Sequence, residues 1–408
     1  MESLGISKLD LKRRNRKQIL HIMRERGPIS RVDIATQLDL TRAAVTIITN
    51  DMIEQGVLKE IGEAPVDEKN PKKGRRKILL DINKNTKFAL GAMINENSIS
   101  VGLSNVAGDV LDKEIMFLNE SVDQQDIISF IAKTGHKMIK KAGLSEKQVL
   151  GMGVGIVPDR WEQLRADLQS GTPDFAKLRY ILELELNIPV VCNNAIALYA
   201  MATLDYSKGP HQNQMLLYSG SRYNLVVISE STLLHHCMID STMVERIIVN
   251  PSGTQAKGYP DGSVYAELTS SAIVDGMRKS FSAENTPVLY DLCGGNADAI
   301  TIEAMDKAYA QGEAAVVTWL DSRIELLAQL LYNMMLTQYA DTAVLQNFHL
   351  SDAQVKKLRD CLKKLAGEEM AKRVVLSSLD EERSFLAGCM YAVEVMFYSQ
   401  GGLKYEAH

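Results

Sequence analysis

The chain has 408 residues, of which 46% are hydrophobic and 24% are charged. This composition is typical of a soluble globular protein with two or three domains, and it excludes collagen-like and disordered chains. No apolar run reaches about 18 residues, and none follows the basic N-terminal stretch, so we expect neither a membrane span nor a secretory signal. The five scattered cysteines form no C-x-x-C pair, which favours reduced thiols and a cytoplasmic location.

Charge is distributed unevenly along the chain. Residues 1–84 contain 18 Lys and Arg against 12 Asp and Glu, a net charge of +6. Residues 85–408 contain 28 against 39, a net charge of −11. A basic head on an acidic body indicates that a polyanionic partner would bind to the head.

Three helices are predicted in the head. Apolar residues at helical spacing among Lys and Arg predict an amphipathic helix over residues 9–26, with a strongly positive solvent face, ended by Gly27-Pro28. Ser30 is the expected N-cap of a second helix, and Thr41 caps a third that ends at Gly56. Two helices joined by a short turn form the arrangement that places the second one in the DNA major groove. The apolar face of the first helix comprises Leu11, Ile19, Ile22 and Met23.

A β-hairpin with a basic tip is predicted after the third helix. Its strands span residues 57–61 and 78–82. Each element alone has an ordinary alternative, plain helix packing or a solvated charged surface. Their order predicts a winged helix-turn-helix DNA-binding domain over residues 1–84. The tip of the hairpin carries four cations, Lys72, Lys73, Arg75 and Arg76. Flexible cations at this position would contact phosphates along the DNA backbone or enter a narrow minor groove.

Position within this predicted domain suggests further contacts with DNA. Thr41, Arg42, Ala43 and Thr46 lie on the first turns of the third helix, where side chains reach base edges or flanking phosphates. Arg42 is the candidate for a guanine contact. Arg31, at the start of the preceding helix, is expected to bind a phosphate.

From residue 85 the pattern changes to strands alternating with helices, which is typical of an α/β domain with a mixed sheet. A second cycle of similar plan begins at Met215 and contains a largely helical region to about residue 340. We interpret residues 85–204 as lobe I, to which a C-terminal helix over 381–400 returns, and residues 205–380 as lobe II. A cleft between two such lobes is the expected ligand site.

A basic winged helix followed by this doubled body resembles the ROK family of sugar-responsive repressors and sugar kinases over essentially the whole chain. The resemblance implies an actin-like, ribonuclease-H-like two-lobed fold for the body. The stretches that carry it are SRVDIATQLDLTRAAVTIITNDMIEQGVLKEIG, GRRKILLDIN, LGMGVGIVP, PVVCNNAIALYA, YSGSRYNLVVISE and ERIIVNPSG.

The chain departs from the ROK kinases at the positions that carry their chemistry. Their first phosphate-binding turn, an acidic residue followed by Gly-Gly-Thr, corresponds here to MINEN, residues 93–97, without glycine. Their second turn corresponds to residues 219–224 and keeps one glycine. Their catalytic aspartate corresponds to Asn194, an amide that accepts no proton at neutral pH. We therefore expect no ATP site, no catalytic residue and no enzymatic activity.

The zinc site of the family is also altered. None of the aligned residues is a soft ligand, so we expect no metal and no other cofactor. The alternative is a metal site at His235, His236 and Cys237, for which the sequence indicates no fourth ligand. The two sugar-binding glutamates of the family correspond to Met243 and Tyr265. The positions aligned with the zinc ligands are Arg246, Ala256, Gly258 and Ser263.

Together these observations predict a DNA-binding transcriptional regulator, a repressor, whose body senses an effector and dimerises. The candidate effector-binding residues are Pro158, Asp159, Asn193 and Asn194, the alternative for the asparagines being to cap the following helix. The expected partners are a double-stranded DNA operator, a sugar or sugar derivative, and further copies in a homodimer or tetramer, with no membrane. Two alternatives stay open: an active carbohydrate kinase with a DNA-binding head, and a ligand-independent DNA-binding protein whose body only oligomerises.

Overall fold

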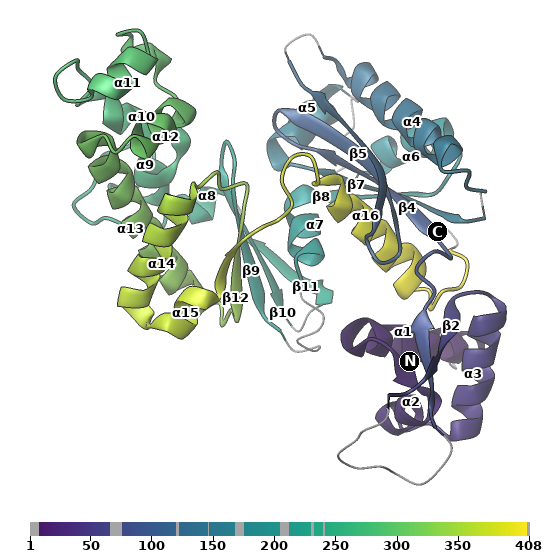
Figure 1. Cartoon of the computed structure of the whole chain (residues 1–408). Helices are drawn as coiled ribbons and strands as arrows, with labels where there is room; N and C mark the ends of the chain where they lie inside the picture. Colours follow the sequence, from purple (N-terminus) through teal and green to yellow (C-terminus); the bar gives the residue numbers. More distant parts are fainter. Residues whose placement is uncertain are drawn as a thin grey trace, which may run out of the picture. The chain divides into compact units, whose positions relative to one another are not determined.

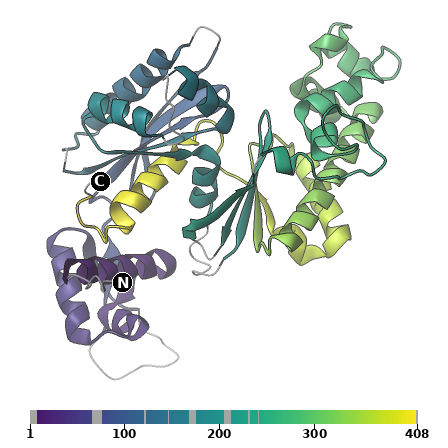
Figure 2. The same cartoon turned by 180° about the vertical axis from the view of Figure 1, so that it is seen from behind.

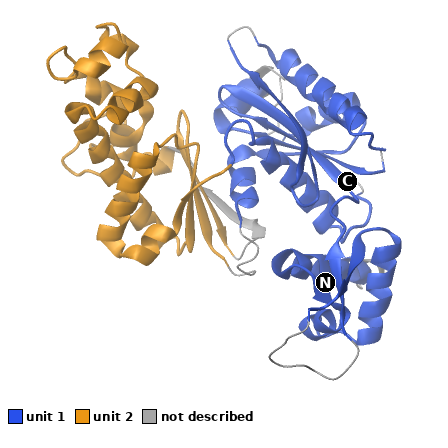
Figure 3. Cartoon of the chain, viewed as in Figure 1, with its two compact units in different colours: residues 1–210, 379–408 blue, residues 211–378 orange. Residues whose placement is uncertain are grey.

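The computed structural model describes residues 8–65, 76–119, 122–145, 147–167, 175–204, 212–229, 232–239 and 241–405. Its contacts divide the chain into two compact units, residues 1–210 with 379–408 and residues 211–378 (Figure 3). The chain thus leaves unit 1, forms unit 2, and returns to unit 1 with its last residues. None of the described helices combines the length and hydropathy that a bilayer crossing requires.

The first part of unit 1 is a helical domain (Figure 1). It contains a small sheet of strand order β1-β3-β2. The predicted helices and hairpin are confirmed, whereas the two-residue strand β1, which pairs antiparallel with β3, was not predicted. The elements are α1 (Lys8–Arg26), β1 (Ile29–Ser30), α2 (Arg31–Leu38), α3 (Arg42–Glu54), β2 (Leu58–Glu63) and β3 (Ile78–Ile82).

Local sequence explains where the helices of this domain begin and end. Ser30 Oγ accepts a hydrogen bond from the Asp33 N–H at 3.3 Å, which caps α2. Thr41 Oγ1 caps α3 in the same way, at 3.2 Å from the Ala44 nitrogen. Gly56 follows α3 with φ +70°, a conformation that glycine adopts without strain. The predicted caps are therefore confirmed.

The rest of unit 1 contains a mixed sheet of order β6-β5-β4-β7-β8. Strands β4, β7 and β8 run parallel, and β5 is antiparallel to both β4 and β6. The helix α5 was not predicted. The strands are β4 (Phe88–Ile94), β5 (Ser98–Asn105), β6 (Val110–Phe117), β7 (Val149–Ile156) and β8 (Val190–Asn194). The helices are α4 (Gln124–Lys141), α5 (Pro158–Asp167), α6 (Ala176–Leu186), α7 (Ala195–Ala202) and α16 (Phe385–Val393), which continues into the π-helical turn η3 (Glu394–Tyr398).

Glycines allow α16 to lie directly on this sheet. A Cβ atom at Gly153 of β7 would lie 2.0 Å from the carbonyl oxygen of Gly388 in α16, and one at Gly91 of β4 would lie 2.1 Å from that of Phe385. Side chains at these positions would therefore force the helix away. The segment after α16 reaches α1, as the two opposite views agree (Figure 1, Figure 2).

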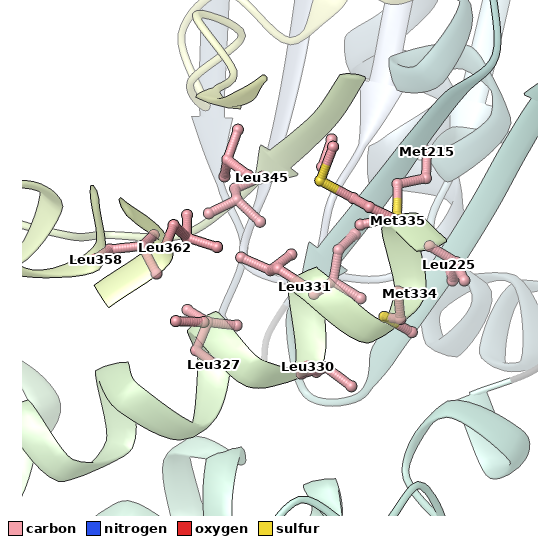
Figure 4. Close-up of a cluster of buried hydrophobic side chains, with 14 of the residues drawn as sticks. Met215, Leu225, Leu327, Leu330, Leu331, Met334, Met335, Leu345, Leu358 and Leu362 are labelled. Carbon is pink, nitrogen blue, oxygen red and sulfur yellow. The ribbon is translucent and has the colours of Figure 1, made fainter. Parts of the chain in front are cut away.

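Unit 2 repeats the strand plan, with order β11-β10-β9-β12-β13. Its core lies between α13 and the sheet, where Leu331 and Met335 pack near Met215 and Leu345 (Figure 4). The strands are β9 (Gln214–Ser219), β10 (Tyr223–Ser229), β11 (Thr232–Ile239), β12 (Thr342–Gln346) and β13 (Val374–Leu376). The helices are α8 (Ser241–Val244), α9 (Val264–Leu268), α10 (Ser270–Arg278), α11 (Pro287–Leu292), the 3₁₀ turn η2 (Ala297–Ala299), α12 (Ile302–Ala310), α13 (Ala314–Thr337), α14 (Asp352–Ala366) and α15 (Glu368–Lys372).

One hydrophobic cluster joins the N-terminal domain to the sheet of lobe I. It contains Ile19 and Leu20 of α1 together with Met396 and Phe397 of η3. The fully buried Arg16 lies on the same face of α1, because positions 16, 19 and 20 are separated by three and four residues. The predicted exposure of the basic side chains of α1 is therefore wrong for Arg16. Leu11, predicted to be inward, is 49% exposed.

Arg16 is satisfied by acceptors from two distant segments. Its Nε donates to the carbonyl oxygen of Gly401 at 2.7 Å. Its Nη1 donates to Asp51 Oδ2 and its Nη2 to Gln55 Oε1, both at 2.9 Å. A buried guanidinium is tolerated only when its donors are paired in this way. These hydrogen bonds therefore hold the segment at Gly401 against the C-terminal end of α3.

We expect Arg16→Ala to lower the free energy of unfolding of the full chain by about 2–3 kcal/mol, because the buried Gly401 carbonyl loses its donor and the ion pair with Asp51 is lost. Urea unfolding followed by circular dichroism measures the change. Arg14→Ala, at an exposed position of the same helix, is the matched control and should stay within about 0.5 kcal/mol of wild type. Equal effects of the two substitutions would contradict a structural role for Arg16.

Candidate functional site

The exposed face of helix α3, which Figure 1 labels, is the candidate surface for base recognition. Val45, Thr49 and Met52 are buried in the core of the domain, so the opposite face meets solvent. The predicted residues Thr41, Arg42, Ala43 and Thr46 are all exposed there. Two further exposed residues of this face, Ile47 and Asn50, were missed by the sequence analysis.

Arg31 forms hydrogen bonds with other elements of the domain. Its Nε donates to Thr49 Oγ1 at 3.1 Å, and its Nη2 donates to Asn50 Oδ1 at 3.0 Å and to Glu60 Oε1 at 2.9 Å. These partners lie on α3 and β2, so Arg31 links both elements to α2. The predicted phosphate contact of Arg31 stays a prediction beside this structural role.

The wing is described in part. Arg76 is exposed and pairs with Glu63 Oε2 at 3.3 Å. Exposed ion pairs of this kind are weak and are screened by salt, so a phosphate can compete for Arg76. Lys72, Lys73 and Arg75 lie outside the described residues. The phosphate contacts of the four cations stay predictions.

The candidate effector residues lie at one edge of the lobe I sheet. β7 and β8 pair in parallel, with Gly155 opposite Asn193. Pro158 and Asp159 begin α5 directly after β7, and Asn194 ends β8. The carboxyl ends of parallel strands share an edge, which is where ligands bind in α/β sheets. The structure thus brings the four predicted residues to the same edge.

Both asparagines have partners inside the protein. Asn194 Oδ1 accepts the Ile196 N–H at 2.8 Å and caps α7. Asn193 Oδ1 accepts the Asn194 N–H at 2.8 Å, and its Nδ2 donates to the Tyr391 hydroxyl at 3.4 Å. The capping alternative is therefore realised for Asn194. Effector binding by either asparagine stays a prediction.

A buried polar network that the sequence analysis missed lies at the same edge. Asn95, directly after β4, accepts the Tyr199 hydroxyl at 2.6 Å and donates to Ser384 Oγ at 3.1 Å. Ser384 also shares a hydrogen bond with Ser100 at 2.5 Å. Burial raises the pKa of Tyr199, so the phenol keeps its proton at neutral pH. The turn after β4 is thereby tied to α7 and to the start of α16.

Arg160 of α5 holds the same turn from outside. Its Nε and Nη2 both donate to the carbonyl oxygen of Glu96, the former at 2.8 Å. This turn corresponds by resemblance to the first phosphate-binding turn of the ROK kinases. A contact between a side chain and a backbone atom 64 positions away leaves no periodic pattern in a single sequence.

In unit 2, aromatic and charged side chains contact one another in and around the stretch that corresponds, by resemblance, to the zinc loop of the ROK family. Tyr259 and Tyr265 stack with 3.9 Å between ring centroids, and the guanidinium of Arg246 lies 5.5 Å from the Tyr259 centroid. The buried carboxylate of Glu245 accepts from Arg222 Nη2 at 2.9 Å and from the Tyr259 hydroxyl at 3.1 Å. These contacts hold the loop through charge and stacking.

Within the described ranges, no three side chains of His, Cys, Asp or Glu gather as a metal site would require. The side chains of residues 235–237 are not among those described.

Burial raises the pKa of the Cys389 thiol to about 12, so this thiol is no nucleophile at neutral pH.

Residues 12–59 match the model of a winged helix-turn-helix DNA-binding domain. The chain is 30% identical over 192 residues to the xylose repressor of Caldicellulosiruptor bescii, which is 45% of either chain. A solved ROK family transcriptional regulator, a homolog of the MLC protein of Escherichia coli, superposes with a TM-score of 0.65 at 16% identity, covering 96% of this chain and 97% of that chain. The chain is thus similar to curated repressors over less than half of its length, and it shares its fold with a ROK family transcriptional regulator.

The body also shares its fold with a solved sugar kinase. A ROK family glucokinase from Streptomyces griseus, solved with glucose and AMPPNP, superposes with a TM-score of 0.54 at 16% identity, covering 75% of this chain and 99% of that chain. The predicted architecture, a winged helix-turn-helix domain followed by a two-lobed actin-like body, is therefore confirmed. The chain spans less than half the length of the curated relatives that it matches.

We expect Asn194→Ala to lower the free energy of unfolding by about 1 kcal/mol, because α7 loses its N-cap. Asn194→Asp is the matched control, since it keeps an oxygen at the capping position and should stay within about 0.5 kcal/mol of wild type. Thermal unfolding of both variants measures the difference. An alanine variant as stable as wild type would show that the cap contributes nothing.

Proposed function

We propose that the chain is a DNA-binding transcriptional regulator, acting as a repressor in the cytoplasm, whose winged helix reads an operator and whose ROK body senses a small molecule. The observation that carries the proposal is the exposed face of α3, with Arg42 at its start, on a head whose net charge is +6. The xylose repressor and the ROK family transcriptional regulator to which the chain is similar support it.

At the operator, Arg42 would pair with a guanine edge, while Thr41, Ala43 and Thr46 line the adjacent bases and phosphates. The cations of the wing, Arg76 among them, would supply the contacts that hold phosphates independently of sequence. Two copies in a homodimer or tetramer would place their heads at half-sites one or more helical turns apart.

The effector would bind at the carboxyl edge of the lobe I strands. The amides of Asn193 and Asn194 and the carboxylate of Asp159 suit the hydroxyl groups of a sugar or sugar derivative, since amides donate and accept hydrogen bonds. Binding would alter DNA affinity by favouring one conformation of the regulator over another.

The proposal includes no phosphoryl transfer. By resemblance, Asn194 corresponds to the catalytic base of the kinases. The turn after β4 is held by hydrogen bonds of Asn95 with Tyr199 and Ser384. Arg160 also donates to the Glu96 carbonyl oxygen of this turn. An ATP-coupled assay across a panel of sugars tests the kinase alternative, which turnover would favour. Thermal-shift screening of the same sugars tests the ligand-independent alternative, which the absence of any stabilising sugar would favour.

Selection from random duplex DNA should enrich a pseudo-palindromic motif. Arg42→Ala is expected to reduce discrimination at one base pair of each half-site about 10- to 100-fold, because a bidentate contact is lost. Arg76→Ala should weaken binding to every sequence alike and lower the slope of log K against log salt by about 0.9, as expected for one phosphate contact. Fluorescence anisotropy at several salt concentrations measures both effects.

Arg359→Ala, an exposed arginine of unit 2, is the control and should bind like wild type. Failure to enrich any motif, together with affinity that does not change with salt, would contradict the proposed function.

A further inference from the structure

The exposed face of α3 carries a large apolar side chain that the protein leaves uncovered. Ile47 is 71% exposed, although Val45, Thr49 and Met52 of the same helix are buried. Ala43 lies one turn earlier on the same face, because residues four apart are neighbours on a helix surface. Ala43 and Ile47 therefore form a short apolar stripe in the middle of the candidate recognition surface.

The polar neighbours of this stripe are already engaged in hydrogen bonds. The Thr46 hydroxyl donates to the Arg42 carbonyl oxygen at 2.7 Å. Asn50 Oδ1 accepts from Arg31 Nη2 at 3.0 Å. The centre of the face therefore offers apolar contact more readily than hydrogen bonds. Ile47 is also stiff, since β-branching restricts its χ1 torsion in a helix, so little side-chain entropy is lost when it is covered.

Among the major-groove edges of the bases, the thymine edge presents a methyl group. An apolar side chain placed against a polar edge would desolvate that edge without bonding to it, whereas one placed against a methyl group removes two apolar surfaces from water. The net charge of +6 on residues 1–84 makes a polyanion the complementary occupant of this face. The stripe thus fits a thymine in duplex DNA.

We propose that Ile47, together with Ala43, recognises the 5-methyl group of an operator thymine and so sets the base preference at that position. This inference rests on the proposed function and deepens it by naming a residue that determines specificity. Arg42 and the wing cations hold the helix at the groove, and Ile47 then distinguishes thymine from the other bases.

The test uses the full chain and the duplex obtained by selection, with each thymine replaced in turn by deoxyuridine, which lacks only the methyl group. At the contacted position, wild type should bind the substituted duplex about 4-fold more weakly, the factor that corresponds to about 0.8 kcal/mol for one buried methyl group. Ile47→Ala should bind the unmodified duplex more weakly than wild type. Its affinity should change less than about 1.5-fold when the same thymine is replaced, because the side chain that contacts the methyl group is absent from this variant.

Leu184→Ala is the matched control, since Leu184 is a 65% exposed apolar residue on α6, and it should respond to deoxyuridine as wild type does. Ile47→Ala is expected to fold, because alanine has the higher helix propensity and the site is exposed. Circular dichroism checks this.

Two results would overturn the inference while leaving the proposed function intact. One is that no deoxyuridine replacement weakens wild type, and the other is that each replacement affects wild type and Ile47→Ala equally. A change of oligomeric state in Ile47→Ala with unchanged response to deoxyuridine would assign Ile47 to a protein contact and also overturn it. If no duplex binds specifically, the proposed function and this inference fail together.

Discussion

The hydrogen bonds of the buried Arg16 guanidinium hold α1, α3 and the segment at Gly401 together, and the arrangement of these parts of unit 1 depends on them. Burial lowers the pKa of Arg16, and the neighbouring Asp51 carboxylate opposes this shift, so the group keeps its charge at neutral pH. A buried charge is stable only where acceptors surround it, and here they come from the end of α3 and from Gly401. A Cβ atom at Gly401 would lie 2.7 Å from Arg16 Cβ, and its φ is +64°, so glycine is required there.

This contact joins the candidate DNA surface to a packed path through lobe I. The path starts near residue 379, where the chain returns from unit 2, and passes the hydrogen bond that the Asn95 amide donates to Ser384 Oγ. It continues along α16, which rests on Gly153, and ends where Arg24 of α1 pairs with Glu394 at 2.6 Å. In the proposed regulator, a change at the strand edge of lobe I has a contiguous structure through which to reach α3.

Local physical chemistry made much of the fold predictable from the sequence. Ser30 and Thr41 mark helix starts because their oxygens satisfy backbone N–H groups, and short apolar runs mark the strands of both lobes. The helix α5 was missed although its signals were present, since Pro158 at a first helical position and Asp159 in the first turn favour a helix start. These two residues were interpreted only as site residues. Family resemblance suggested the candidate effector edge, which composition alone did not indicate.

The remaining features depend on contacts between distant residues. Asn95 and Ser384 are 289 positions apart, and Arg16 and Gly401 are 385 apart, so no local spacing relates them. The burial of Arg16 opposes the general exposure of charged side chains, although its spacing from Ile19 placed it on the apolar face. Ile47 was missed because apolar residues of a helix were considered only as core residues.

The central claim is that the segment around Gly401, through Arg16, holds α3 in place. Hydrogen–deuterium exchange tests it most directly when a chain ending at Ser399 is compared with one ending at Tyr405. The account predicts faster exchange in α1 and in the C-terminal half of α3 of the shorter chain, with β4 and β5 unchanged. Identical exchange of α1 and α3 in the two chains would contradict it.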